Sequence, residues 1–478
     1  MNKRLMLGVG VTALVLCGCF SKVEVLPAVS TPPVFAPLPE PEAQTQVGLA
    51  ISGGGSRAAT FAAGVLEALG EMRIKDSGGE RSLLERVQYI SSVSGGSLAT
   101  AYYAALKPPK AEPVLGDRGL APAYQTFFTA YKAAMQENFE WPAALQQVLL
   151  FRAFNPTKGA YSLADVWDGK FFHGMTFATL YEREARGDSP RVILNGTSYN
   201  SGKRFVLTTL PYADFDYDFV GWFIEDLRVR LGLAGKTEGL AIIQRNLESA
   251  REHLLPLTFE QIGADHHQLR LSLGVATSAS FPPVVGPVTY SVAGNPPYQH
   301  VGDGGLFDNL GTESLTTLFL KKIPKDDPKK RGLIIVVDAA YPFDAAKYDL
   351  DKNKKGFEVF KDDPSRIVGI MEERADAYQL MLWDALRTQG ILLPDFAHLR
   401  VEVLKHSEAT WSGYQDLPEE CRGEFAPDVT PETIQQAVSQ IPTLFRITPC
   451  HGALLVKAAL KVVEAHRDRI VKFLEAQP

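Results

Sequence analysis

Residues 47–72, VGLAISGGGSRAATFAAGVLEALGEM, place three consecutive glycines between two apolar segments of different character. Val47 to Ser52 is short and apolar, which is typical of a buried strand, whereas Ala58 to Met72 has the longer apolar pattern of a helix. A second unit repeats this order, with a strand predicted over Val87 to Val93 and a helix over Ser97 to Leu106. Two successive units of strand, tight turn and helix predict an α/β fold with a mostly parallel sheet.

The rest of the chain continues this alternation. Further buried strands are predicted at 191–195, 204–208, 269–273, 333–338 and 399–404. Further helices are predicted at 121–137, 225–254, 312–321, 366–389, 431–438 and 452–475. Because neither a repeat nor a second linker interrupts the pattern, residues 47–478 are interpreted as one domain. The formal charge of -6 argues against a general nucleic-acid-binding protein, since such proteins carry a basic face.

The first nineteen residues predict a lipoprotein signal peptide. Lys3 and Arg4 precede an apolar run from Leu5 to Leu16, which is too short for a stable membrane span. Gly18 and Cys19 then resemble a bacterial lipobox, in which cleavage leaves an acylated cysteine as the new N-terminus. An uncleaved signal anchor is the alternative. Cys19 is therefore the predicted lipidation site, and residues 1–18 are the predicted signal peptide.

The residues after Cys19 predict where the protein is held. Phe20 and Ser21 stand where bacterial lipoproteins retained in the inner membrane usually have aspartate, so the outer membrane, facing the periplasm, is the expected location. Residues 20–46 contain six prolines and few bulky apolar side chains, which predicts a semi-extended tether over 19–46. In an oxidising periplasm Cys421 and Cys450 can form a disulfide; two separately buried thiols are the alternative.

Two of the turns carry residues suited to acyl chemistry. Gly53, Gly54 and Gly55 lack Cβ atoms, so their backbone N–H groups can converge on an anion at the start of the following helix. In SVSGGS (92–97), the predicted strand ends at Val93, which puts Ser94 at a sharp corner between strand and helix. Spacing alone also admits Ser97, but its place in the first helical turn favours local hydrogen bonding.

A third turn supplies a carboxylate. GDGGLFDNLG (302–311) follows the apolar block ATSASFPPVV (276–285) and contains Asp303 before two glycines. In order, GGGSR, SVSGG, ATSASFPP and DGG resemble the motifs of the patatin-like phospholipases across roughly 47–340. A weaker likeness continues in IPTLFRITP (441–449).

This resemblance implies a three-layer α/β fold, with a mostly parallel central sheet flanked by helices, and a catalytic dyad without histidine. Ser94 is then the nucleophile, Asp303 the general base, and Gly53, Gly54 and Gly55 the oxyanion hole. Arg57 matches the basic residue that closes the glycine motif, where it either orients the loop or meets a phosphate. The implied chemistry needs no metal and no cofactor.

Alternatives remain for the base and for the function. A triad using His300, or a later histidine such as His398, His406 or His451, is the rival mechanism. The expected function is a membrane-tethered lipid acyl hydrolase acting on phospholipid, lysophospholipid or neutral lipid. Passing the acyl group to an alcohol is a second possibility, and a non-catalytic envelope lipoprotein is a third. Candidates for an acyl groove or interfacial surface, each with a core position as the alternative, are Phe127, Phe128, Phe139, Trp141, Phe151, Phe154, Phe215, Tyr217, Phe219, Trp222 and Phe223.

Overall fold

A computed structural model describes residues 21–40, 43–76, 79–149, 158–217, 252–282, 285–293, 295–323, 329–341 and 399–476. It also describes the isolated positions 245, 248, 375 and 377. The helices predicted at 225–254 and 366–389 lie almost wholly outside these residues.

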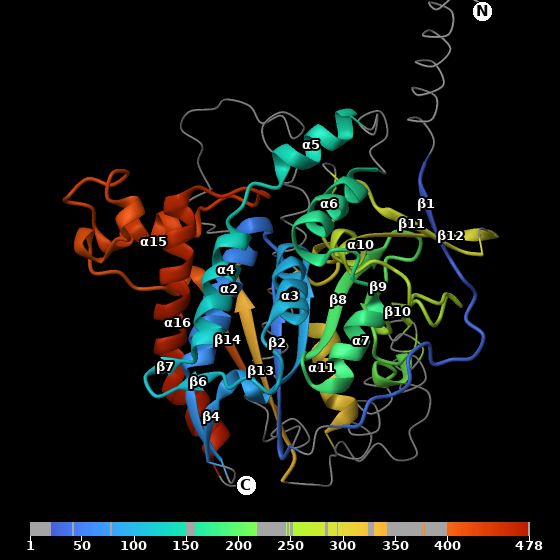
Figure 1. Cartoon of the computed structure of the whole chain (residues 1–478), viewed down its shortest axis with the longest axis horizontal. Coiled ribbons are helices and arrows are strands. Elements are labelled where there is room, and N and C mark those ends of the chain that lie inside the picture. Colours follow the sequence, from blue (N-terminus) through green and yellow to red (C-terminus); the bar gives the residue numbers. More distant parts are fainter. Residues whose placement is uncertain are drawn as a thin grey trace, which may run out of the picture.

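One large sheet organises the described residues (Figure 1). Its spatial order is β1 (Val23–Leu26), β11 (Val288–Val292), β12 (Asn295–Asp303), β8 (Arg191–Ser198), β5 (Val87–Val93), β2 (Thr45–Ile51), β13 (Arg331–Asp338) and β14 (Leu399–Lys405), with β9 (Arg204–Thr208) and β10 (Leu257–Thr258) branching from β8. The run from β8 to β14 is parallel throughout. β12 enters antiparallel between β8 and β11, so the sheet is mostly parallel, as predicted.

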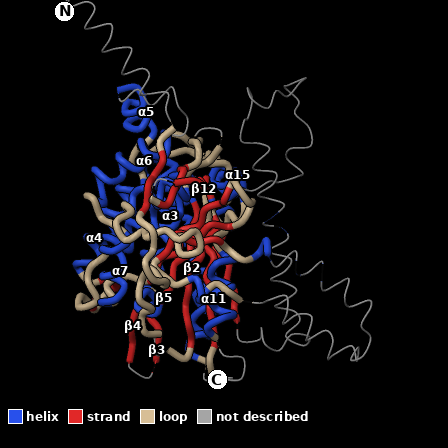
Figure 2. The backbone as a smooth tube through the Cα atoms, turned by 90° about the vertical axis from the view of Figure 1, so that its right-hand side faces the viewer, coloured by secondary structure: helices blue, strands red, loops and turns tan. Residues whose placement is uncertain are grey.

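Helices cover both faces of the sheet (Figure 2). One face is covered by α2 (Gly55–Glu71), α3 (Ser94–Leu106), α4 (Pro122–Met135), α6 (Gly159–Trp167), α7 (Phe177–Arg186), α10 (Leu271–Ser278) and α16 (Pro449–Glu475). On the other face lies α11 (Thr312–Lys322). The remaining described elements of four or more residues are α5 (Glu140–Leu149), α15 (Pro431–Ser439), a 3-10 turn (Leu83–Arg86), a π-helical turn (Asp168–Phe172) and the hairpin of β3 (Arg73–Asp76) and β4 (Gly79–Ser82).

The alternation of side chains along the central strands explains this layering. On β2, Leu49 and Ile51 join the core beneath α2 and α3, whereas Ala50 faces Leu315 and Phe319 of α11. Both faces are apolar, which is why parallel strands of this kind read as continuous hydrophobic runs. The predicted three-layer α/β fold is therefore confirmed.

One predicted strand is wrong. The apolar run 269–273 leads into α10, which begins at Leu271 and is buried on all sides. A helix buried all round has no polar stripe, so a short apolar run does not distinguish it from a buried strand.

The Pro-rich segment 21–40, predicted as part of a semi-extended tether, packs along the domain as a strap. Val23–Leu26 forms β1 and pairs with β11, and Phe35 is buried against the rings of Tyr181 and His267. The strand that follows begins at Thr45 rather than at residue 47. Proline composition indicated an extended backbone correctly, but the partners of Phe35 and of Val23–Leu26 lie more than a hundred residues away along the chain.

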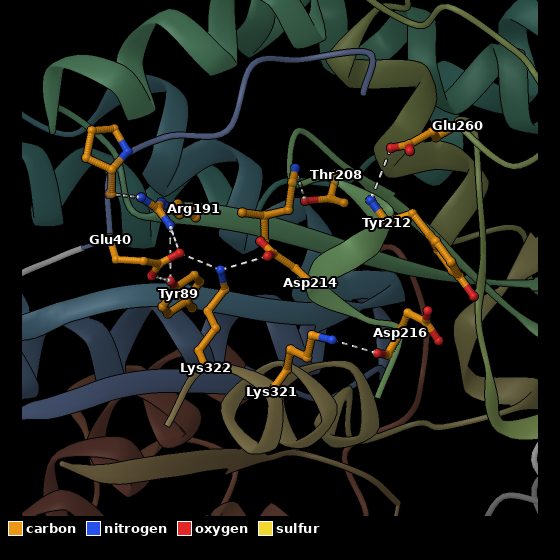
Figure 3. A network of polar contacts seen from close by, with 12 residues as sticks. Glu40, Tyr89, Arg191, Thr208, Tyr212, Asp214, Asp216, Glu260, Lys321 and Lys322 are labelled. Atoms are coloured by element: carbon orange, nitrogen blue, oxygen red, sulfur yellow. Dashed lines mark hydrogen bonds and ion pairs between the residues drawn. The ribbon is translucent and has the colours of Figure 1, made fainter. Parts of the chain in front are cut away.

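A polar network fastens the end of this strap (Figure 3). The Glu40 carboxylate accepts a hydrogen bond from Tyr89 at 2.9 Å and forms ion pairs with Lys322 and Arg191. Lys322 also pairs with Asp214 at 2.8 Å. Tyr89 and Arg191 lie near the starts of β5 and β8, so the network binds the strap to the amino end of the sheet.

Candidate active site

The nucleophile candidate lies in a strained turn. β5 ends at Val93 and α3 begins at Ser94, whose φ is 52°. Positive φ is uncommon for a residue with a Cβ atom, and at a corner between strand and helix it presents the side chain above the sheet. Ser94 is 7% exposed, so its hydroxyl is enclosed without being sealed off.

Two glycines after Ser94 let this turn approach the glycine-rich turn. A Cβ atom on Gly95 would lie 2.0 Å from the carbonyl oxygen of Gly55, and one on Gly96 would lie 2.5 Å from that of Ser52. No side chain fits at either position. The sequence SGG after the strand is therefore a packing requirement of the site as well as a turn signal.

Ser278, Asn195 and Ser97 form a polar frame that holds the Ser94 backbone by hydrogen bonds. The Ser94 N–H donates to Ser278 Oγ at 3.1 Å, and the Ser278 hydroxyl in turn donates to the Asn195 carbonyl at 2.5 Å. Ser97 Oγ lies 2.8 Å from Ser278 Oγ, so Ser97 belongs to this frame rather than to the reacting groups. Sequence reasoning singled out the ATSASFPP block but gave Ser278 no role.

Strand register brings Asp303 to Ser94. Asn195 of β8 pairs with Val93, and the next residue, Gly196, pairs with Asp303 at the end of β12. A Cβ atom on Gly304 would lie 2.4 Å from the Asn195 carbonyl oxygen, which explains why a glycine follows the aspartate.

The Asp303 carboxyl is poised between its two protonation states near neutrality. It is 1% exposed, and burial raises its pKa to about 7, against the opposing effects of the Gly305 N–H and the nearby Ser94 hydroxyl. Asp303 Oδ1 accepts the Gly305 N–H at 2.8 Å. The structure thus brings together the two residues predicted to react, and it raises the basicity of the carboxylate.

The glycine turn offers two of its three predicted oxyanion donors. Gly53 lies beside Ser94, because a Cβ atom placed on it would be 3.3 Å from the Ser94 Cβ. Its own N–H, however, donates to the Asn309 carbonyl at 2.9 Å and is committed to the fold. Within the described residues the N–H groups of Gly54 and Gly55 donate to no other group.

Gly95 is a further candidate donor that sequence reasoning missed. Its N–H belongs to the first turn of α3, where helix amides have no intrahelical partner, and it directly follows Ser94. The residue after the nucleophile supplies an oxyanion donor in strand-to-helix elbows of this type, so the sequence did contain the signal.

Arg57 orients the glycine loop. Its side chain is 1% exposed, with Nε donating to the Ala339 carbonyl at 2.7 Å and one terminal nitrogen donating to the Ile441 carbonyl at 2.6 Å. A guanidinium held in this way joins the start of α2 to the end of β13 and to the segment before α16. Of the two predicted roles, the geometry favours orientation of the loop over contact with a phosphate.

The segment 441–449 closes the site from the C-terminal part of the chain. The Leu444 carbonyl accepts the Ser56 N–H at 2.7 Å, and a Cβ atom on Gly55 would lie 2.4 Å from that same oxygen.

Cys421 and Cys450 are joined by a disulfide whose Cα atoms are 4.7 Å apart, which links the loop before α15 to the first turn of α16.

The rival histidines lie elsewhere among the described residues. The His300 Nδ1 atom lies 2.9 Å from the Thr289 hydroxyl oxygen. His406 is buried, and its Nδ1 atom lies 3.3 Å from the Asp338 carbonyl oxygen. Burial and the positive charge of Arg57 lower the pKa of His406 to about 3. His451 lies in the first turn of α16, and His398 is outside the described residues. No described histidine is among the groups that shift the pKa of Asp303.

Most of the aromatic candidates that the structure describes occupy core positions, which was the alternative given for each of them. Phe127, Phe128, Phe139 and Phe215 are buried, whereas Trp141 is 70% exposed. Tyr217 is partly buried at the end of a described segment, and the other aromatic candidates lie outside the described residues.

Comparison with known proteins identifies the family. A family model described as Patatin-like phospholipase matches residues 49–316. No curated protein matches this chain. Among solved structures, human GIVD cytosolic phospholipase A2 is similar at 12% identity with a TM-score of 0.42, over 90% of this chain and 59% of the human one. Because the family model spans more than half of the sequence, the chain belongs to the patatin-like phospholipase family.

Proposed function

We propose that this protein is a lipid acyl hydrolase that uses a dyad of Ser94 and Asp303. The observation that carries the proposal is the pairing of a serine in a strained turn with a buried carboxyl whose pKa lies near 7. A carboxylate of ordinary basicity is a poor base toward a serine hydroxyl, and burial removes part of that mismatch.

The proposed reaction has two balanced steps. Asp303 takes the proton of Ser94 as Oγ attacks the ester carbonyl, and the tetrahedral oxyanion is met by the N–H groups of Gly54, Gly55 and Gly95. Collapse of this intermediate breaks the ester bond, and the proton passes from Asp303 to the departing alcohol. Water then attacks the acyl-serine with Asp303 again as base, which releases the fatty acid and restores Ser94.

We further propose that an acyl chain on Cys19 holds the enzyme at the cell envelope, in the outer membrane and facing the periplasm. The support comes from the sequence: a basic start, a short apolar run, and Gly18 before Cys19. Among the described residues no helix is long and apolar enough to cross a membrane. A membrane phospholipid, lysophospholipid or neutral lipid is then the proposed substrate.

A fluorophosphonate probe tests the nucleophile. We expect the probe to label the protein, Ser94→Ala to abolish labelling, and the folded Ser97→Ala variant to retain it, because Ser94 lies beside the buried carboxylate whereas the Ser97 hydroxyl contacts Ser92 and Ser278. Labelling is read by in-gel fluorescence and peptide mass spectrometry. Failure of the folded protein to label would support a non-catalytic lipoprotein instead. Product analysis with added alcohol separates free fatty acid from transferred acyl groups, and hence hydrolase from acyltransferase.

The pH dependence of hydrolysis tests the base. Asp303 must be ionised to accept the proton, so kcat/KM for a soluble short-chain ester should rise about tenfold per pH unit up to pH 7 and then level off. A carboxyl of unperturbed pKa near 3.9 would give a flat profile over the same range. A profile that is flat from pH 5 to pH 8 would therefore contradict the assignment of Asp303 as a base of raised pKa.

A further inference from the structure

The helix α5 exposes an unusually apolar face. Trp141, Leu145, Val148 and Leu149 are 70%, 45%, 65% and 65% exposed, and their spacing puts all four on one side of the helix. The neighbouring Ala144 is also exposed, and no charged side chain interrupts this face. A helix of a globular protein ordinarily turns such a face inward, so an outward apolar stripe of this kind indicates a contact surface.

The strap places the start of the described chain beside the helix that follows α5. The Lys22 ammonium lies 3.7 Å from the centre of the Tyr161 ring on α6. α6 adjoins α5, since a Cβ atom on Gly159 would lie 3.8 Å from Gln147 Nε2. Figure 1 shows β1 entering the sheet at the same end of the molecule as α5.

Chain length limits the distance between Cys19, the proposed site of the lipid anchor, and Lys22, which lies beside α6. Three peptide units separate Cys19 from Lys22, and each extended residue spans at most about 3.6 Å, so the Cα atoms of the two are within about 11 Å. A tether over 19–46 that did not pack on the domain would have allowed the domain any orientation relative to Cys19, whereas a strap bound from Val23 onward allows few.

From these observations we infer that the α5 face, meaning Trp141, Leu145, Val148 and Leu149, docks on the lipid surface that holds the acyl chain of Cys19. The inference rests on the proposed lipid anchor and names the second point of contact. An apolar stripe with a tryptophan is the composition that partitions into the boundary between head groups and acyl chains. Two contacts at one end of the molecule set its orientation. In Figure 1 the arrow of β13 points toward the end at which α5 lies. β5 is parallel to β13 through β2, so Ser94, which follows β5, lies toward the same end.

Depth-dependent quenching tests the contact. The full acylated chain is reconstituted in vesicles of phosphatidylethanolamine and phosphatidylglycerol, with and without phosphatidylcholine brominated near the head group, and vesicle-bound protein is isolated by flotation. We expect tryptophan emission to be quenched by the brominated lipid, and the Trp141→Phe chain to lose that part of the quenching. Equal quenching of the two chains would overturn the inference.

A matched pair of substitutions tests its consequence. Leu145 on α5 and Leu460 on α16 are 45% and 41% exposed, so Leu145→Gln and Leu460→Gln remove similar apolar surface from different places. We expect Leu145→Gln to lower hydrolysis of vesicle phospholipid at least about threefold, because it weakens docking, and Leu460→Gln to leave it unchanged. Both variants should hydrolyse a soluble short-chain ester at the original rate. Equal vesicle rates for the two variants would overturn the inference, as would failure of the chain to float with vesicles.

The two proposals fail separately. If every chain, including the unsubstituted one, is inactive on the soluble ester while Trp141 is still quenched, the esterase proposal is wrong and the docking surface is supported. If the ester is hydrolysed but Trp141 is not quenched, the esterase stands and the docking surface is overturned.

Discussion

Asp303→Asn is expected to lower kcat for ester hydrolysis by about 10³-fold or more while leaving the fold intact. The amide keeps the shape of the carboxyl and an oxygen that can accept the Gly305 N–H, but it cannot take the proton of Ser94. General base catalysis contributes about 10²- to 10⁴-fold, and here the same group acts in both acylation and deacylation. Steady-state kinetics on a soluble short-chain ester measure the loss.

The stability of this variant separates loss of chemistry from loss of structure. Burial raises the pKa of Asp303 above its unfolded value, so at pH 8 the folded protein ionises a group that its surroundings disfavour. An amide removes that cost. The thermal midpoint of Asp303→Asn at pH 8 is therefore expected to equal or exceed that of the original chain, with the difference shrinking as the pH falls toward 4.

Histidine variants provide the contrast. His300→Ala and His406→Ala are expected to retain hydrolysis, since His300 contacts Thr289 and His406 contacts the Asp338 carbonyl. A folded but inert His300→Ala or His406→Ala chain, or an active Asp303→Asn chain, would restore the histidine triad as the better mechanism.

The parts of the fold that were predictable are those whose signal is local. The strand, glycine turn and helix around Gly53 to Gly55 follow from composition over some twenty residues, and so does the corner at Ser94. The pairing of Ser94 with Asp303 was implied by the resemblance to the patatin-like phospholipases. Strand register explains it physically: Val93 pairs with Asn195, and the next residue of β8 pairs with Asp303.

The parts that were missed depend on partners distant in the chain. The sequence of residues 21–40 does not indicate that Phe35 will pack against Tyr181, or that Glu40 will form an ion pair with Lys322. The same holds for Gly53, whose predicted role as a donor fails at its amide because the Asn309 carbonyl is already there. Three adjacent glycines look equivalent in a sequence, and only their hydrogen bonds distinguish them.

The contact between the glycine turn, Gly53 to Gly55, and Leu444 is the clearest feature that depends on residues distant in the chain. The substitution Gly55→Ala tests its importance. Gly55 has a φ of 57°, so any alanine there is strained by about 1–2 kcal/mol. In addition its Cβ would lie 2.4 Å from the Leu444 oxygen and 3.0 Å from the Leu444 carbonyl carbon, both of them backbone atoms. Either the segment 441–449 or the turn itself has to move.

Gly202→Ala is the matched control, because Gly202 has a φ of 69° with no atom within 4 Å of the added Cβ. Both substitutions carry the backbone strain, and only Gly55→Ala adds the collision. Displacing one oxyanion donor costs about 10²- to 10³-fold in kcat, so we expect a loss of that size for Gly55→Ala and a change of less than about twofold for Gly202→Ala.

The comparison is made by steady-state kinetics well below the thermal midpoints of both variants, with near-ultraviolet circular dichroism to show that each is folded. Equal activity of the two folded variants would mean that the Gly54 and Gly55 amides do not stabilise the oxyanion. In that case Gly95 would be the remaining donor, since its amide directly follows Ser94 in the first turn of α3.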